Sequence, residues 1–122
     1  MKKKLILKEN KAFKRAYFRG KFKAHPLLVT YITKNKLGKM RVGITTSKKV
    51  GNAVSRSRAR RVIRSAFDEI CKGGFTACGY DIVFVARTAT ASVKSYDVMR
   101  VMKKQLQVLL SGKASGKDRA SN

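Results

Sequence analysis

The chain has 122 residues, 43% of them hydrophobic, which excludes global disorder and fits one folded domain with a buried core. Its 30 Lys and Arg residues against 6 Asp and Glu give a formal net charge of +24, which opposes compaction unless a polyanion binds, and we expect that polyanion to be nucleic acid. An anionic membrane is the competing partner. The sequence shows no long apolar segment or signal-peptide core, so a cytoplasmic protein is expected.

The first predicted helix lies in the segment KENKAFKRAYFRG and ends at Gly20. Its apolar positions recur at helical spacing: Ala12, Phe13, Ala16 and Tyr17. After His25 and Pro26 break this pattern, LLVTYIT alternates β-branched and aromatic residues, which predicts a strand with Tyr31 on one face. The turn KLGK and the alternating run MRVGITTS then predict an antiparallel hairpin with that strand.

A second helix is predicted from the N-cap Asn52 onward, because winding the next residues at about 100° each separates two chemistries. The apolar residues share one arc: Ala59, Val62, Ile63, Ala66, Phe67 and Ile70. The arginines form an i, i+4, i+8 ridge beside it, with two more farther round: Arg56, Arg60 and Arg64, then Arg58 and Arg61. One face therefore packs on the sheet, and the other displays guanidinium groups suited to bidentate phosphate contact.

A merely solvated helix face is the alternative explanation for this charge. Solvated faces usually mix both signs, whereas no acid follows these arginines until Asp68 and Glu69. Like charges one turn apart destabilise a helix, so the pattern favours phosphate binding.

After this helix, KGGF and CGYD punctuate the chain, and IVFVA is a continuous apolar run typical of a central strand covered on both faces. A last helix is predicted from the N-cap Ser95 to just before Gly112. Its apolar positions are Tyr96, Met99, Met102, Leu106 and Leu109. Residues 112–122 are small, polar and charged, so we predict a disordered basic tail after a folded domain that spans residues 1–111.

The run KKVGNAVSRSRARRVIRSAF resembles the signature of the protein subunit of bacterial ribonuclease P. The segments LKENKAFKRAYFRGK, RVGITTSKKVG and YDIVFVAR resemble the same family, so the likeness covers nearly everything from about Leu5 to Leu110. Ser57 stands where the family usually has asparagine. Serine is shorter and has fewer donors, so the resemblance does not carry over the contact that asparagine makes.

The resemblance implies an α+β fold: a single small domain of the order α-β-β-β-α-β-α, with a mixed central sheet and helices. It also implies that the arginine helix lies in a left-handed βαβ crossover. General rules predict a right-handed connection, so this handedness rests on the family alone. The residues themselves indicate three strands, and the stretch from Leu27 to Ser47 has room for a fourth.

The resemblance also implies the function of an RNA-binding subunit of ribonuclease P, in which a large RNA subunit cleaves the 5′ leader from precursor tRNA. The protein alone is then expected to be inactive, with Mg²⁺ bound mainly by the RNA and one protein per RNA. The residues implied to bind the RNA subunit are Lys48, Lys49, Asn52, Arg56, Ser57, Arg58, Arg60, Arg61 and Arg64. The residues implied to bind the leader, in a cleft between the first helix and the sheet, are Phe13, Tyr17 and Tyr31.

Aromatic faces suit a single-stranded leader because unstacked bases stack on them whatever their sequence. Core packing is the alternative for each ring, and it is strongest for Phe13, since Tyr17 and Tyr31 carry hydroxyl groups in a basic setting. The other phenylalanines are assigned to the core: Phe18, Phe22, Phe67 and Phe84.

An independent hydrolase is a poor fit, because its chemistry needs clustered carboxylates or a histidine in a cleft. Here the acids are scattered, and His25, the single histidine, is predicted to lie in a loop. Cys71 and Cys78 lack Cys-x-x-Cys spacing and are expected to be free thiols. A structural RNA-binding protein of the ribosomal type remains as an alternative function. The sequence also leaves open whether the RNA-subunit and leader surfaces are separate.

Overall fold

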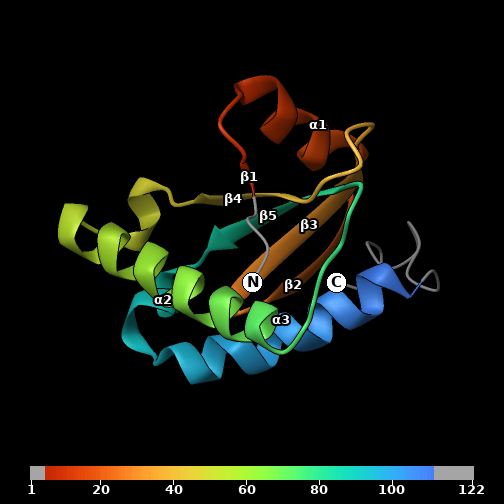
Figure 1. Ribbon diagram of the computed structural model, residues 1–122. Coiled ribbons are helices and arrows are strands. Elements are labelled where there is room, and N and C mark those ends of the chain that lie inside the picture. Colours follow the sequence, from red (N-terminus) through yellow and green to blue (C-terminus); the bar gives the residue numbers. More distant parts are fainter. Residues whose placement is uncertain (1–4, 112–122) are drawn as a thin grey trace.

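A five-stranded mixed sheet separates one helix on one face from two helices on the other (Figure 1). The computed structural model describes residues 5–111. Its elements in chain order are β1 (Leu5–Ile6), α1 (Asn10–Arg19), β2 (Lys21–His25), β3 (Leu28–Lys34), β4 (Arg41–Thr45), the 3-10 turn η1 (Lys48–Val50), α2 (Ala53–Lys72), β5 (Tyr80–Ala86), the 3-10 turn η2 (Thr88–Ser92) and α3 (Ser95–Leu110).

The strands lie in the order β1-β4-β5-β3-β2, so the last strand of the chain occupies the centre of the sheet. Strand β5 pairs antiparallel with β3 and parallel with β4. At the edges, β2 pairs antiparallel with β3 and the short β1 pairs parallel with β4. The predicted helix and strand order and the mixed sheet are confirmed, with β1 as an addition, and α2 lies in the crossover from β4 to β5.

Two strand predictions are wrong. The expected hairpin between β3 and β4 does not form, because β5 lies between these strands. The fourth strand lies at Lys21–His25, upstream of the stretch in which the sequence has room for it. Pro26 and Leu27 form the turn of the true hairpin, β2–β3, in which His25 pairs with Leu28. The break at Pro26 therefore marks a turn between two strands and not the start of the first one.

The core is divided by the sheet into two clusters. The larger one contains residues of α2, α3 and the sheet, including Phe67, Phe84 and Met102. The smaller one contains Ala12 and Ala16 of α1 with Leu7 and Val83. Neighbouring residues of β5 thus enter opposite clusters, which confirms that this strand is covered on both faces. The whole predicted apolar arc of α2 is buried, together with Cys71.

Both long helices begin close to their predicted caps. The Asn52 side chain accepts a hydrogen bond from the Ser55 amide at 2.9 Å, which confirms it as the N-cap of α2. Helix α3 begins one residue earlier than predicted, because the Lys94 amide is bonded to the Asp97 carboxylate at 3.3 Å and Lys94 becomes the N-cap. Gly112 and the predicted tail lie outside the described residues, so the proposed domain boundary stays a prediction.

One buried ion pair joins β4 to β5 at paired positions of the sheet. Arg41 donates from Nε to Asp81 Oδ1 at 2.8 Å and from Nη2 to Oδ2 at 2.7 Å, and Asn35 Nδ2 donates to Oδ1 at 2.8 Å. Burial alone would raise the pKa of Asp81, but these hydrogen bonds and the charge of Arg41 outweigh it and leave that pKa below its usual value. Asp81 therefore has a structural role.

Candidate nucleic-acid interface

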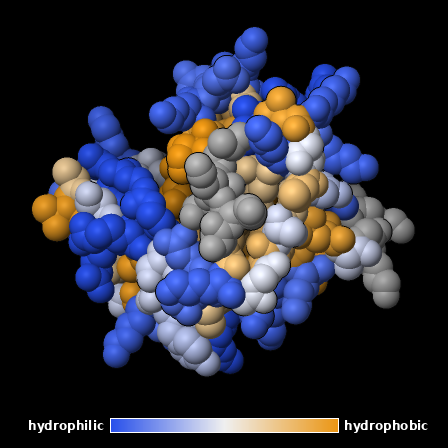
Figure 2. Space-filling model, in the orientation of Figure 1, coloured by the Kyte–Doolittle hydropathy of each residue, from blue (hydrophilic) through white to orange (hydrophobic). Residues whose placement is uncertain are grey.

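All nine residues implied to bind an RNA subunit lie within residues 48–64, which we call the arginine segment. Figure 2 shows hydrophilic side chains gathered over this end of α2. Lys48 and Lys49 are exposed in η1, which leads into the helix. Gly51 makes the junction with a φ of 134°, where a side chain would be strained and its Cβ would lie 3.1 Å from that of Ser55. The glycine thus allows the tight junction between η1, which carries the two lysines, and α2.

The arginines of this segment differ in how firmly the protein holds them. Arg56 Nη1 donates to the Gly51 carbonyl at 2.7 Å, and Arg58 Nε donates to the Ala91 carbonyl of η2 at 2.6 Å. Arg61 and Arg64 are exposed and have no hydrogen-bond or ion-pair partner among residues 5–111. Arg56 and Arg58 are therefore partly structural, whereas the guanidinium groups of Arg61 and Arg64 can direct all their N–H donors to a ligand.

A groove of about 520 Å³ lies between α1 and β4, and we call it the α1 groove. Phe13 and Tyr17 line it from α1, facing Ile44 and Thr45 of β4, and the Tyr17 hydroxyl lies 3.4 Å from Thr45 Oγ1. Gly43 lies beneath the Phe13 ring, because a Cβ there would come within 2.7 Å of two ring atoms. Phe13 also packs on the smaller core cluster, so this half-buried ring belongs to both the core and the groove.

Tyr31 does not line the α1 groove itself but extends its aromatic surface along the sheet. Its ring centroid lies 5.0 Å from that of Tyr17 in an edge-on arrangement and 5.2 Å from that of Phe22 in a stacked one. Phe22 is half-buried and lies outside both core clusters, so its assignment to the core is wrong. Phe18 is 81% exposed, and its assignment to the core is also wrong. Phe67 and Phe84 are buried as predicted.

Arg60 connects the arginine segment to the α1 groove. It lies on α2, yet it lines the groove and donates from Nη1 to Thr46 Oγ1 at 2.9 Å. A smaller cavity of about 130 Å³ beside it is lined by both Arg60 and Arg64. The two implied surfaces, whose separation the sequence leaves open, are therefore contiguous. Ser57 is half-buried and makes no side-chain hydrogen bond to the described residues.

The described residues hold no group of three His, Cys, Asp or Glu side chains that could bind a metal ion. Cys71 is buried and Cys78 exposed, and both are free thiols as predicted. His25 ends β2 and so lies in a strand, where a loop was predicted. Within residues 5–111, no helix is both long and apolar enough to cross a membrane.

A small α+β domain with an arginine-lined crossover helix beside an aromatic groove defines a basic nucleic-acid-binding protein. A family model described as Ribonuclease P matches residues 1–110, so the chain belongs to the ribonuclease P protein family. Its members are the protein component of the RNA-based endoribonuclease that processes the 5′ end of tRNA, and their partner is the ribonuclease P RNA. This membership sets aside the ribosomal-type alternative.

Three similar proteins agree with this assignment. A ribonuclease P protein component from Clostridioides difficile (strain 630) is 43% identical over 101 residues, which cover 80% of this chain and 84% of that protein. The solved structure of the Staphylococcus aureus RNase P protein matches with a TM-score of 0.73 at 31% identity and covers 92% of this chain and 98% of that one. The RNase P protein from Thermotoga maritima matches with a TM-score of 0.68 at 25% identity, covering 88% and 96%.

Proposed function

We propose that this protein assists ribonuclease P in two ways, by binding the catalytic RNA through the arginine segment and the single-stranded leader of precursor tRNA in the α1 groove. One observation carries the proposal: an aromatic groove adjoins an acid-free row of arginines through the shared residue Arg60. A single RNA-binding face of this kind holds the leader next to the RNA that cleaves it.

The arginine segment supports binding to a folded RNA. Guanidinium groups present paired donors that match phosphate oxygens, and a helix holds successive groups at fixed spacing. Arg61 and Arg64 lie one turn apart on the exposed side of α2, so both reach a backbone that crosses the helix. The side-chain amide donors of Asn52 remain for RNA while its carbonyl oxygen caps the helix.

The α1 groove supports binding to single-stranded RNA of any sequence. Phe13 and Tyr17 offer ring surface to unstacked bases, while Lys14 and Arg60 line the same groove and attract phosphates. Tyr31 and Phe22 continue the aromatic surface beyond it. Stacking and charge discriminate little between bases, which suits a protein that serves many precursor tRNAs.

Cleavage itself is assigned to the RNA. Since the described residues offer no carboxylate cluster for a metal ion, we propose that the RNA binds the Mg²⁺ ions and that one protein joins each RNA. The protein contributes cationic side chains that bring two polyanions together.

Reconstitution tests this division of labour. The protein alone is expected to leave precursor tRNA uncut, and adding it to a bacterial ribonuclease P RNA is expected to restore cleavage at Mg²⁺ concentrations at which the RNA alone is weak. The reason is that the cations of the chain replace part of the divalent screening. Cleavage by RNA-free protein, or no gain at low Mg²⁺, would contradict the proposal.

Tyr17→Ala and Tyr31→Ala test the groove. Each is expected to weaken binding of precursor tRNA by roughly 1–3 kcal/mol, the contribution of one stacked base, and to leave binding of mature tRNA nearly unchanged. Filter binding with both RNAs measures the difference. Tyr96→Ala is the matched control, because this tyrosine is 62% exposed on α3, on the other face of the sheet. Equal losses of affinity for precursor and mature tRNA would show that the leader does not bind in the α1 groove.

A further inference from the structure

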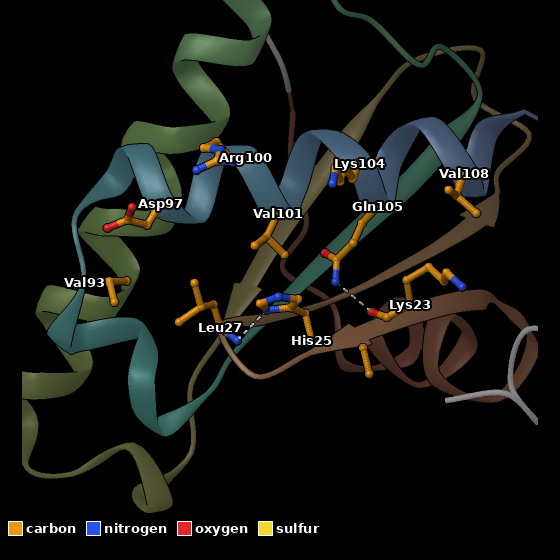
Figure 3. Close-up of a pocket in the computed structure, with 11 residues that line it drawn as sticks. Lys23, His25, Leu27, Val93, Asp97, Arg100, Val101, Lys104, Gln105 and Val108 are labelled. Atoms are coloured by element: carbon orange, nitrogen blue, oxygen red, sulfur yellow. Dashed lines mark hydrogen bonds between the residues drawn. The ribbon is translucent and has the colours of Figure 1, made fainter.

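A second groove lies on the opposite face of the sheet from α1, between strand β2, the β2–β3 turn and helix α3 (Figure 3). We call it the α3 groove. Its volume of about 480 Å³ falls within the range of about 300–1,000 Å³ that small-molecule sites occupy. Its apolar lining comes from both sides: Ala24, Leu27, Val93, Val101 and Val108. It shares no lining residue with the α1 groove.

The base of the α3 groove is fixed by a buried amide. Gln105 is 6% exposed, and its Oε1 accepts a hydrogen bond from Thr30 Oγ1 at 2.6 Å. Its Nε2 donates to the carbonyl of Leu28 at 2.9 Å and to that of Lys23 at 3.2 Å. These bonds tie α3 to β2 and β3, so the two walls of the groove are held at a set distance before any ligand binds.

Cations stand on both walls. Arg100 and Lys104 are one turn apart on α3, and Lys23 comes from β2 (Figure 3). The groove contains one acid, Asp97, whose Oδ2 is bonded to the Lys94 amide at the start of the helix. Positive charge therefore prevails along the groove, beside an apolar surface.

His25 adds a flat ring beside Leu27 (Figure 3). Its Nδ1 accepts a hydrogen bond from the Leu27 amide at 3.1 Å, so the neutral ring carries its proton on Nε2. The ring is exposed and offers the groove both a stacking face and a donor.

We propose that the α3 groove binds one nucleotide of a single-stranded RNA, with its base against His25 and the apolar lining and its phosphate at Arg100 and Lys104. A nucleotide joins a flat, largely apolar base to an anionic phosphate, and the groove presents complementary surfaces side by side. An unstacked nucleotide is required, because a paired base keeps its faces covered within a helix. The site is independent of the arginine segment and the α1 groove.

Nuclear magnetic resonance of the full chain, titrated with a short oligoadenylate RNA, tests this site. Saturable shifts are expected at the amides of Ala24, His25 and Val101. Lys104→Glu is expected to weaken the affinity reported by these amides about tenfold, as loss of a phosphate contact with charge reversal implies. Lys103→Glu is the matched control, since Lys103 lies outside this groove and the charge change is identical. Ala24→Trp, which fills the groove without changing charge, is expected to abolish the shifts.

Four results would overturn the proposal. If the groove amides do not shift, RNA does not bind in this groove. If Lys103→Glu and Lys104→Glu weaken the affinity equally, binding depends on the overall charge of α3 and not on a specific site. Adenosine monophosphate that binds as tightly as the oligonucleotide would identify a free nucleotide as the ligand. Polyglutamate that produces the same shifts at the same affinity would identify an acidic protein segment.

Discussion

Replacing Asp81 with alanine is expected to destabilise the protein by about 3–5 kcal/mol, the usual cost of removing one partner of a buried ion pair. Arg41 would keep a mostly buried guanidinium without its counter-charge, and Asn35 would lose the acceptor that it shares with Arg41. The loss falls where β4 meets β5, the central strand of the sheet. Denaturant unfolding of parent and variant, monitored by circular dichroism, measures the change.

A double variant separates the lost pair from the isolated charge. Arg41→Met combined with Asp81→Leu is expected to recover much of the stability, because no charge is then left buried alone. An Asp81→Ala protein as stable as the parent would show that the pair contributes nothing.

The same pair predicts an acid-dependent loss of stability. The folded pKa of Asp81 lies below its usual value of 3.8, so on acidification the unfolded chain takes up this proton first. The stability that the Asp81 carboxylate contributes is complete above its usual pKa and disappears as the pH falls through its folded pKa. Unfolding midpoints across this acid range are expected to fall more steeply for the parent than for Asp81→Asn. Parallel curves would mean that the carboxylate is not stabilised by folding.

Replacing Arg61 and Arg64 together with alanine is expected to weaken binding to the catalytic RNA by roughly one to two orders of magnitude. The free energy of unfolding is expected to stay close to that of the parent. Each phosphate contact adds about 0.7–0.9 to the slope of log affinity against log salt, so the slope should fall by up to about 2. Neither side chain has a partner among residues 5–111, so folding loses nothing there. Affinity at several salt concentrations measures both effects.

Two control variants separate a specific phosphate contact from a general loss of positive charge. Lys36→Ala with Lys39→Ala removes the same charge from exposed positions outside the arginine segment and should have a small effect. Arg61→Lys with Arg64→Lys keeps the charge but removes the paired donors, and it is expected to restore only part of the affinity. A full restoration would mean that charge alone binds the RNA. Replacing Arg56 and Arg58 instead is a poorer test, because both hold backbone carbonyls.

Helix α2 could be predicted from the sequence because its features are local. Its cap, its apolar arc and its arginine ridge all follow from helical spacing within one segment. The core assignment of Phe18 could have been avoided by the same local argument, since this residue stands two positions beyond the buried Ala16 and so points away from the core.

The order of the strands in the sheet depends on contacts between residues far apart in the chain, which local sequence patterns do not predict. Strand β2 escaped prediction because Lys21–His25 is mostly polar and lies at an edge with no fully buried residue. The wrong hairpin came from assuming that neighbouring strands in the chain pair with each other, whereas β5 separates them. In the candidate site, the arginine ridge was predictable from helical spacing, whereas the placing of Phe13, Tyr17 and Tyr31 in a cleft came from the resemblance. The link through Arg60 was not predictable, because it needs α2 to lie against the end of β4.

The position of β5 also bears on how the chain reaches this fold during synthesis. Strands β3 and β4 follow each other in the chain, but both pair with β5. Those pairings form only after residues 80–86 have emerged from the ribosome. Until then the nascent chain exposes two unpaired apolar strand edges, together with the smaller core cluster that awaits Val83. Completion of the sheet is therefore expected to occur late and all at once, and nascent chains truncated before Tyr80 should be degraded by proteases that the finished domain resists.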